Sequence, residues 1–133
     1  MLSDNAVELL VFTCAIESNG GSSLKNQGLG IYGMNHENYH DIWENYLQNK
    51  PGLYMRLASN FDVHRIPDEY RLIYDLRFST AMAMIHYSRV SQSLPLSQDY
   101  SALWQYYKAH YKVSLNVISE KDSIDKYLTF INN

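Results

Sequence analysis

The chain has 133 residues, of which 46% are hydrophobic and 19% are charged, and its formal net charge is -3. This length and composition are typical of one globular domain with its own core, and they exclude a disordered chain. The slightly acidic balance offers no basic surface for nucleic acid, so neither DNA nor RNA is an expected partner. We therefore predict a single domain over residues 1–133.

The first segment, MLSDNAVELLVFTCAIESNGG, predicts an apolar helix. A cap among Ser3, Asp4 and Asn5 would begin it, and apolar residues then recur at helical spacing, at Val7, Leu10, Val11 and Cys14. The segment lacks a basic n-region and its apolar run is too short for a bilayer, so we expect neither a signal peptide nor a transmembrane segment. Cys14 is the only cysteine, and its apolar neighbours predict a buried, unreactive thiol.

The rest of the chain also has helical spacing. The glycine-rich segment from Asn19 to Gly33 should end the first helix and form a loop. Further helices are expected from about His36 to Leu47, after Pro51, from Pro67, after a cap near Asp75, after Asp99 and after Ser119. Without repeats or linkers, this pattern predicts a compact all-α domain.

Residues 36–40, His-Glu-Asn-Tyr-His, match the H-E-x-x-H signature of zinc peptidases, in which both histidines bind the metal. The glycines before the motif predict a loop until about Asn35, which would leave His36 in a fraying first turn. Tyr46 stands where a third histidine would lie, Asp41 is an unusual charged neighbour, and later carboxylates carry no marker. We interpret the match as accidental and predict no metal and no other cofactor, so no stoichiometric zinc should survive dialysis.

Glu17 closes the first helix just before the glycine-rich loop. The partial negative charge of a helix C-terminus and the apolar bulk of Ile16 both favour the protonated acid. A carboxyl that stays protonated can act as a general acid toward a glycosidic oxygen. The alternative is a glutamate that points into water, which is the usual situation for this residue type.

The segment AIESNGG (15–21) resembles the Glu-Ser motif that ends the catalytic helix of soluble lytic transglycosylases and goose-type lysozymes. GLGIYGM (28–34) is similar to the Gly-Leu-Met-Gln segment that follows in those families. DLRFSTAMAMIHYSRV and ALWQYYKAHYKV fall where the families have a long central helix and an Ala-Tyr-Asn helix. The order matches from about Val7 to Val113, and the chain resembles a small phage-encoded branch of the lysozyme-like superfamily.

This resemblance implies a lysozyme-like helical fold and cleavage of peptidoglycan glycan strands. Glu17 would be the catalytic acid and base, Ser18 would orient it or the sugar, and Tyr106 would replace the tyrosine of Ala-Tyr-Asn. Tyr32 and Tyr107 lie in the same motif segments and would also contact the sugar. The mechanism of the family needs one carboxyl, whereas a hydrolase would need a second. The candidates for a second are Asp62, Asp68, Glu69 and Asp75.

Two departures from the family pattern leave another interpretation open. Gly33 stands where the families have a substrate-contacting glutamine, and Tyr107 stands where they have asparagine. The chain is therefore either a phage-associated enzyme, of lytic transglycosylase or muramidase type, or an inactive lysozyme-like protein that docks other virion proteins. Both would be found in the phage virion or the host cytoplasm, and the enzyme would act at the bacterial cell wall. The segment after Val113 matches no motif.

Overall fold

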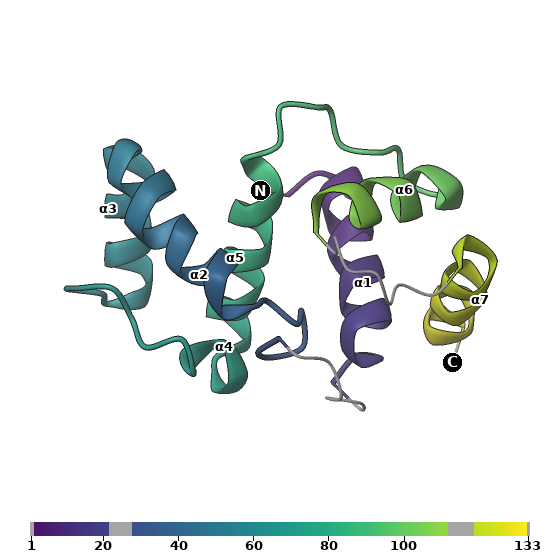
Figure 1. Cartoon of the computed structure of the whole chain (residues 1–133), viewed down its shortest axis with the longest axis horizontal. Helices are drawn as coiled ribbons and strands as arrows, with labels where there is room; N and C mark the ends of the chain where they lie inside the picture. The colour runs from purple at the N-terminus through teal and green to yellow at the C-terminus, as the bar shows by residue number, and fades with distance from the viewer. Residues whose placement is uncertain (1, 22–27, 112–118, 133) are drawn as a thin grey trace.

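The computed structural model describes residues 2–21, 28–111 and 119–132. Within these ranges the chain is mainly helical, with seven α-helices and no strands (Figure 1). The predicted all-α fold is therefore confirmed. Residues 22–27 of the expected glycine-rich loop lie outside the described ranges.

The helices follow in chain order as α1 (Asp4–Ser18), α2 (His36–Asp41), α3 (Pro51–Phe61), α4 (Arg71–Tyr74), α5 (Leu76–Ser88), α6 (Tyr100–His110) and α7 (Glu120–Ile131). A π-helical turn (Ile42–Tyr46) and a 3₁₀ turn (Leu47–Asn49) continue α2. The predicted caps are confirmed, because a side-chain oxygen of each accepts a hydrogen bond from the backbone N–H three residues later. These caps are Ser3 for α1, Asp75 for α5, Asp99 for α6 and Ser119 for α7.

The second predicted helix is not α-helical through to Leu47. The backbone N–H of Leu47 bonds to the carbonyl of Ile42, five residues back, which widens the chain into a π turn. The side chain of Gln48 then donates to the carbonyl of Trp43 at 3.3 Å. Ile42, Trp43 and Leu47 are all buried in this stretch.

Two other sequence expectations are wrong in detail. The fourth helix begins at Arg71 and not at Pro67. The Pro67 carbonyl instead accepts a hydrogen bond of 2.8 Å from the hydroxyl of Tyr39 in α2. Val7 is exposed, since α1 buries the sides of the helix that carry residues such as Leu9 and Phe12.

Two apolar clusters share α5. The first cluster joins α1, α6 and α7, and the second joins α2, its continuation, α3 and α4. Ala83 and Tyr87 of α5 belong to the first cluster, whereas Phe78, Met82 and Ile85 belong to the second. At 3.6 residues per turn these two sets lie on opposite sides of the helix. Figure 1 accordingly shows α5 between the two groups of helices.

A tight turn at residues 29–34 precedes α2. Leu29 and Met34 exchange backbone hydrogen bonds of 2.8 and 3.2 Å across it. Gly30 has a φ of +73°, and a Cβ atom there would lie 2.1 Å from the carbonyl oxygen of Leu72 in α4. The turn therefore lies directly against α4, and only glycine fits at this position.

Candidate active site

Glu17 lies in the last turn of α1 and is only 7% exposed. The hydroxyl of Tyr107, on α6, donates a short hydrogen bond to Glu17 Oε2. Burial, with the negative charge of Glu17, raises the pKa of Tyr107 well above its ordinary value, so this hydroxyl remains a donor. The carboxyl is thus held at the negative end of the α1 dipole by a residue 90 positions away in the sequence.

A group of buried tyrosines lies around this pair. The rings of Tyr107 and Tyr111 are stacked with centroids 6.0 Å apart, and those of Tyr111 and Tyr87 are 5.2 Å apart. Burial is the largest cause of the raised pKa of both Tyr87 and Tyr111, and the charge of Glu17 adds to it. Tyr111 is not among the residues predicted for the site, although it follows Tyr107 by one helical turn and this spacing indicates a shared face.

The neighbouring Thr13 completes this network. Its Oγ1 donates to the carbonyl of Leu9 at 2.8 Å, so the hydroxyl of Tyr87 must donate to Thr13 Oγ1, 2.7 Å away. Thr13 is fully buried in the last half of α1. The first apolar cluster therefore contains a second buried polar pair, Thr13 with Tyr87, besides Glu17 with Tyr107.

Ser18 and Tyr32 fix the turn that faces the end of α1. Ser18 Oγ donates to the carbonyl of Ile31 at 2.7 Å and accepts from the N–H of Gly21 at 3.0 Å. Tyr111 donates to the carbonyl of Tyr32 at 2.5 Å. Ser18 and Tyr32 are both buried. In this structure their described contacts are therefore with the protein itself.

Tyr106 is adjacent to Tyr107 in sequence, but its hydroxyl donates to the carbonyl of Gln92, at 3.1 Å, in the loop between α5 and α6. Of the five residues predicted to form the site, Glu17 and Tyr107 are in direct contact. Ser18 and Tyr32 join the same region through the turn. The ring of Tyr106 packs against that of Tyr87, with centroids 5.8 Å apart, but its hydroxyl contacts the loop.

The four carboxylates considered as a second catalytic group are engaged elsewhere. Asp75 caps α5, and Asp68 accepts from a backbone N–H at 2.8 Å. Glu69 lies 2.5 Å from the ring of His36. The side chain of Asp62 is almost wholly exposed. Of the five candidate carboxyls, Glu17 is thus the one that lies beside the buried tyrosines Tyr87, Tyr107 and Tyr111.

An open hollow of about 420 Å³ lies beyond the end of α1, lined by Asn19, Asp125, Lys126 and Thr129. Lys126 Nζ donates to the carbonyl of Ile16 at 3.0 Å, which places a positive charge at the negative end of the helix. Glu17 does not line this hollow. The hollow therefore provides a polar surface next to the helix end, separate from the carboxyl itself.

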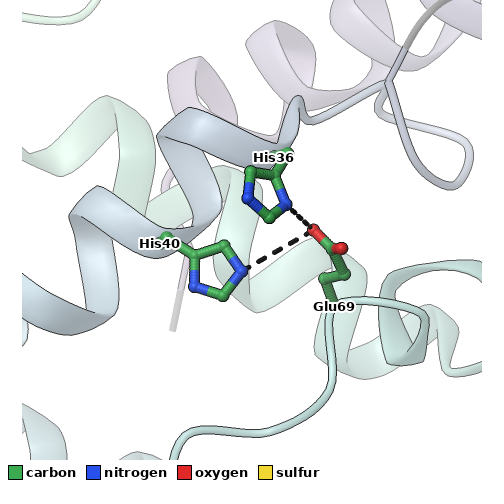
Figure 2. Close-up of side chains that lie close together, drawn as sticks. All are labelled: His36, His40 and Glu69. Atoms are coloured by element: carbon green, nitrogen blue, oxygen red, sulfur yellow. Dashed lines mark hydrogen bonds and ion pairs between the residues drawn. The ribbon is translucent and has the colours of Figure 1, made fainter.

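His36, His40 and Glu69 meet at the start of α2 (Figure 2). The ligand-type atoms of these three side chains all lie within 4.8 Å of one another. The H-E-x-x-H motif indicates the two histidines, but it does not indicate Glu69 as a third ligand, because the glutamate is 33 residues from His36.

Comparison of the chain with protein-family models, with curated proteins and with solved structures found no match. The described helices include none that is both long and apolar enough to cross a membrane.

Proposed function

We propose that this protein cleaves the glycan strands of peptidoglycan as a lytic transglycosylase, with Glu17 as both acid and base. One observation carries the proposal: the Glu17 carboxyl is almost fully buried at the C-terminal end of α1 and accepts a hydrogen bond from Tyr107. Limited solvation and the helix dipole favour the protonated acid that must act first, whereas the hydrogen bond that Tyr107 donates favours the carboxylate that follows.

In the proposed reaction, the Glu17 carboxyl first protonates the bridging glycosidic oxygen, and the bond from that oxygen to the sugar carbon breaks. The carboxylate then takes the proton of the muramyl 6-hydroxyl, whose oxygen closes a ring on the same carbon. The carboxyl regains its proton and no water is consumed. Tyr107, which already donates to Glu17, would stabilise the carboxylate that exists between the two steps.

The engagement of the other carboxylates supports a lyase in preference to a hydrolase. A hydrolase needs a second carboxylate at a defined separation across the sugar. Asp75, Asp68 and Glu69 each have another partner, and Asp62 lies out in solvent beside His64. A mechanism that uses one carboxyl is therefore the simpler match to these contacts.

The test measures the release of muropeptides from purified peptidoglycan, with mass analysis to separate anhydro products from hydrated ones. Glu17→Gln should lower the rate by about a hundredfold or more, as expected for loss of a general acid and base. Glu8→Gln is the matched control, because Glu8 lies on the same helix and also accepts a hydrogen bond from a tyrosine, Tyr127. Equal release by the unmodified protein and Glu17→Gln would remove Glu17 from the mechanism.

A second candidate function is that of an inactive virion docking protein. It is favoured by a group of apolar side chains on and beside α4, each more than half exposed: Tyr70, Ile73, Tyr74 and Leu76. In addition, Gly33 has a φ of +58°, so a glutamine at this position would be strained. This function would be supported by folded protein that releases no muropeptide and is recovered with phage particles.

A further inference from the structure

We infer that His36, His40 and Glu69 form a binding site for a divalent metal ion, with Zn²⁺ as the ion that suits these ligands best. The site joins α2 to the segment that precedes α4 (Figure 2). Two imidazoles and one carboxylate are a ligand set that zinc sites commonly use, with water in the remaining position. This inference does not involve Glu17 and does not depend on the proposed cleavage of glycan strands.

The distances from the Glu69 carboxylate to the two histidines lie on either side of the spacing that a tetrahedral ion requires. With bonds of about 2.1 Å, such an ion holds its ligand atoms about 3.4 Å apart. Glu69 Oε2 lies 2.5 Å from His36 Nδ1 and 3.7 Å from His40 Nε2. An ion that replaces the proton between His36 and Glu69 would require these two ligand atoms to move apart by roughly one ångström. The side chain of His36 is 62% exposed, so its ring has room for this movement.

A second carboxylate lies behind one of the ligands. While Nε2 of His40 faces Glu69, Nδ1 of the same ring lies 3.7 Å from Glu44 Oε1. Histidines that bind metals usually direct their other nitrogen to a carboxylate or a carbonyl, which orients the ring and increases its basicity. Glu44 follows His40 by four residues, which places it on the same side of the helix. Its carboxylate is therefore in a position to orient the His40 ring.

The backbone around the three ligands is also well held. Asn35 caps α2 by accepting a hydrogen bond of 2.7 Å from the N–H of Asn38, which fixes the first turn that contains His36. Tyr39 is fully buried, and its hydroxyl donates to the carbonyl of Pro67, two residues before Glu69. The middle of the H-E-x-x-H segment thus anchors the loop that supplies the third ligand.

The fold supplies what the H-E-x-x-H segment by itself lacks for metal binding. The first turn of α2 begins at His36 as expected, but it is capped. The carboxylate of Asp41 is bound by Arg89 at 2.7 Å and by Asn45 at 2.6 Å. The missing third ligand comes from Glu69, far along the chain. Zinc binding by these three side chains would make the prediction of no metal wrong.

The experiment uses tag-free protein that has been dialysed against a chelator and then titrated calorimetrically with Zn²⁺. The unmodified protein should bind one equivalent, and its melting temperature should rise with zinc because the site exists only in the folded chain. Mg²⁺ should not bind, since that ion prefers oxygen ligands in octahedral geometry. Absence of zinc binding to the folded protein would overturn the inference.

Variants locate the ion. Glu69→Gln keeps the shape of the side chain and should weaken zinc binding at least tenfold, and His40→Ala should abolish it. His64→Ala is the matched control, because His64 also lies beside a carboxylate, 3.2 Å from Asp62, but outside the cluster. Binding by His40→Ala or Glu69→Gln equal to that of the unmodified protein would refute the site. Glu17→Gln should bind zinc normally, which separates this test from the test of glycan cleavage.

Discussion

The hydroxyl of Tyr107 on α6 donates a hydrogen bond to the carboxyl group of Glu17 on α1. An equivalent pair joins the same helix to α7, where Tyr127 donates to Glu8. Both phenol rings are buried. Two pairs of the same chemistry therefore fix α1 in the first apolar cluster, and only one of them lies in the proposed active site.

Tyr107→Phe should reduce the free energy of unfolding by about 1–3 kcal/mol, because the buried carboxyl of Glu17 loses a hydrogen-bond donor. It should also lower kcat for release of muropeptides with little change in KM, since Tyr107 positions Glu17 and stabilises its carboxylate. Urea unfolding and steady-state kinetics measure the two effects. Tyr127→Phe should lose comparable stability but keep its kcat. Equal kcat values for both variants would contradict a positioning role for Tyr107.

Thr13→Val should destabilise the protein by about 1–3 kcal/mol, because the buried hydroxyl of Tyr87 would lose the group to which it donates. Valine has nearly the same shape as threonine, so packing is little changed. Thr13→Ser keeps the oxygen and should cost much less. The comparison uses chemical denaturation followed by circular dichroism. A serine variant less stable than the valine variant would show that packing, and not the hydrogen bond, dominates.

Acid should destabilise the protein through His86. Burial lowers the pKa of His86 from 6.5 to about 4. Its Nε2 donates to the carbonyl of His110 at 2.7 Å, and its Nδ1 accepts from Arg89 at 3.0 Å. Protonation of Nδ1 would place an N–H donor against the N–H donor of Arg89. The unfolded chain therefore takes up the proton more readily than the folded chain.

From this difference, the contribution of His86 to stability should be intact above pH 6.5 and should be lost as the pH falls toward 4. The loss should total about 3 kcal/mol. Unfolding free energies across this range should fall more steeply for the unmodified protein than for His86→Gln, which has no proton to gain. Carboxyl groups that titrate in the same range contribute to both proteins. Parallel pH profiles would contradict the prediction.

Gly30→Ala should destabilise the protein by at least about 2 kcal/mol, because the position has a positive φ and the new Cβ would collide with the carbonyl oxygen of Leu72. Gly52→Ala is the matched control, since Gly52 lies in α3 and has no atom within 4 Å of the added Cβ. That variant should be unchanged or up to about 1 kcal/mol more stable. Thermal unfolding of both variants provides the measurement.

The sequence by itself determined the local features of the fold. Ser3, Asp75, Asp99 and Ser119 could be recognised as helix caps because each bonds to a backbone group only three residues away. The end of α1 could also be predicted, since Asn19 has a left-handed backbone that ends the helix. The burial of Cys14 followed from its apolar neighbours, and burial raises the pKa of this thiol, as expected for an unreactive cysteine.

The tertiary structure decided which distant groups meet. Nothing within a few residues of Glu17 indicates that Tyr107 will donate to it, and nothing near His36 and His40 indicates that Glu69 will lie between them. Such contacts arise because α5 contributes apolar side chains to both clusters. The packing on α5 thereby fixes where α1, α6 and the segment before α4 lie relative to one another. Packing energy is a sum over the whole core, so these pairings follow from the complete fold and not from any short motif.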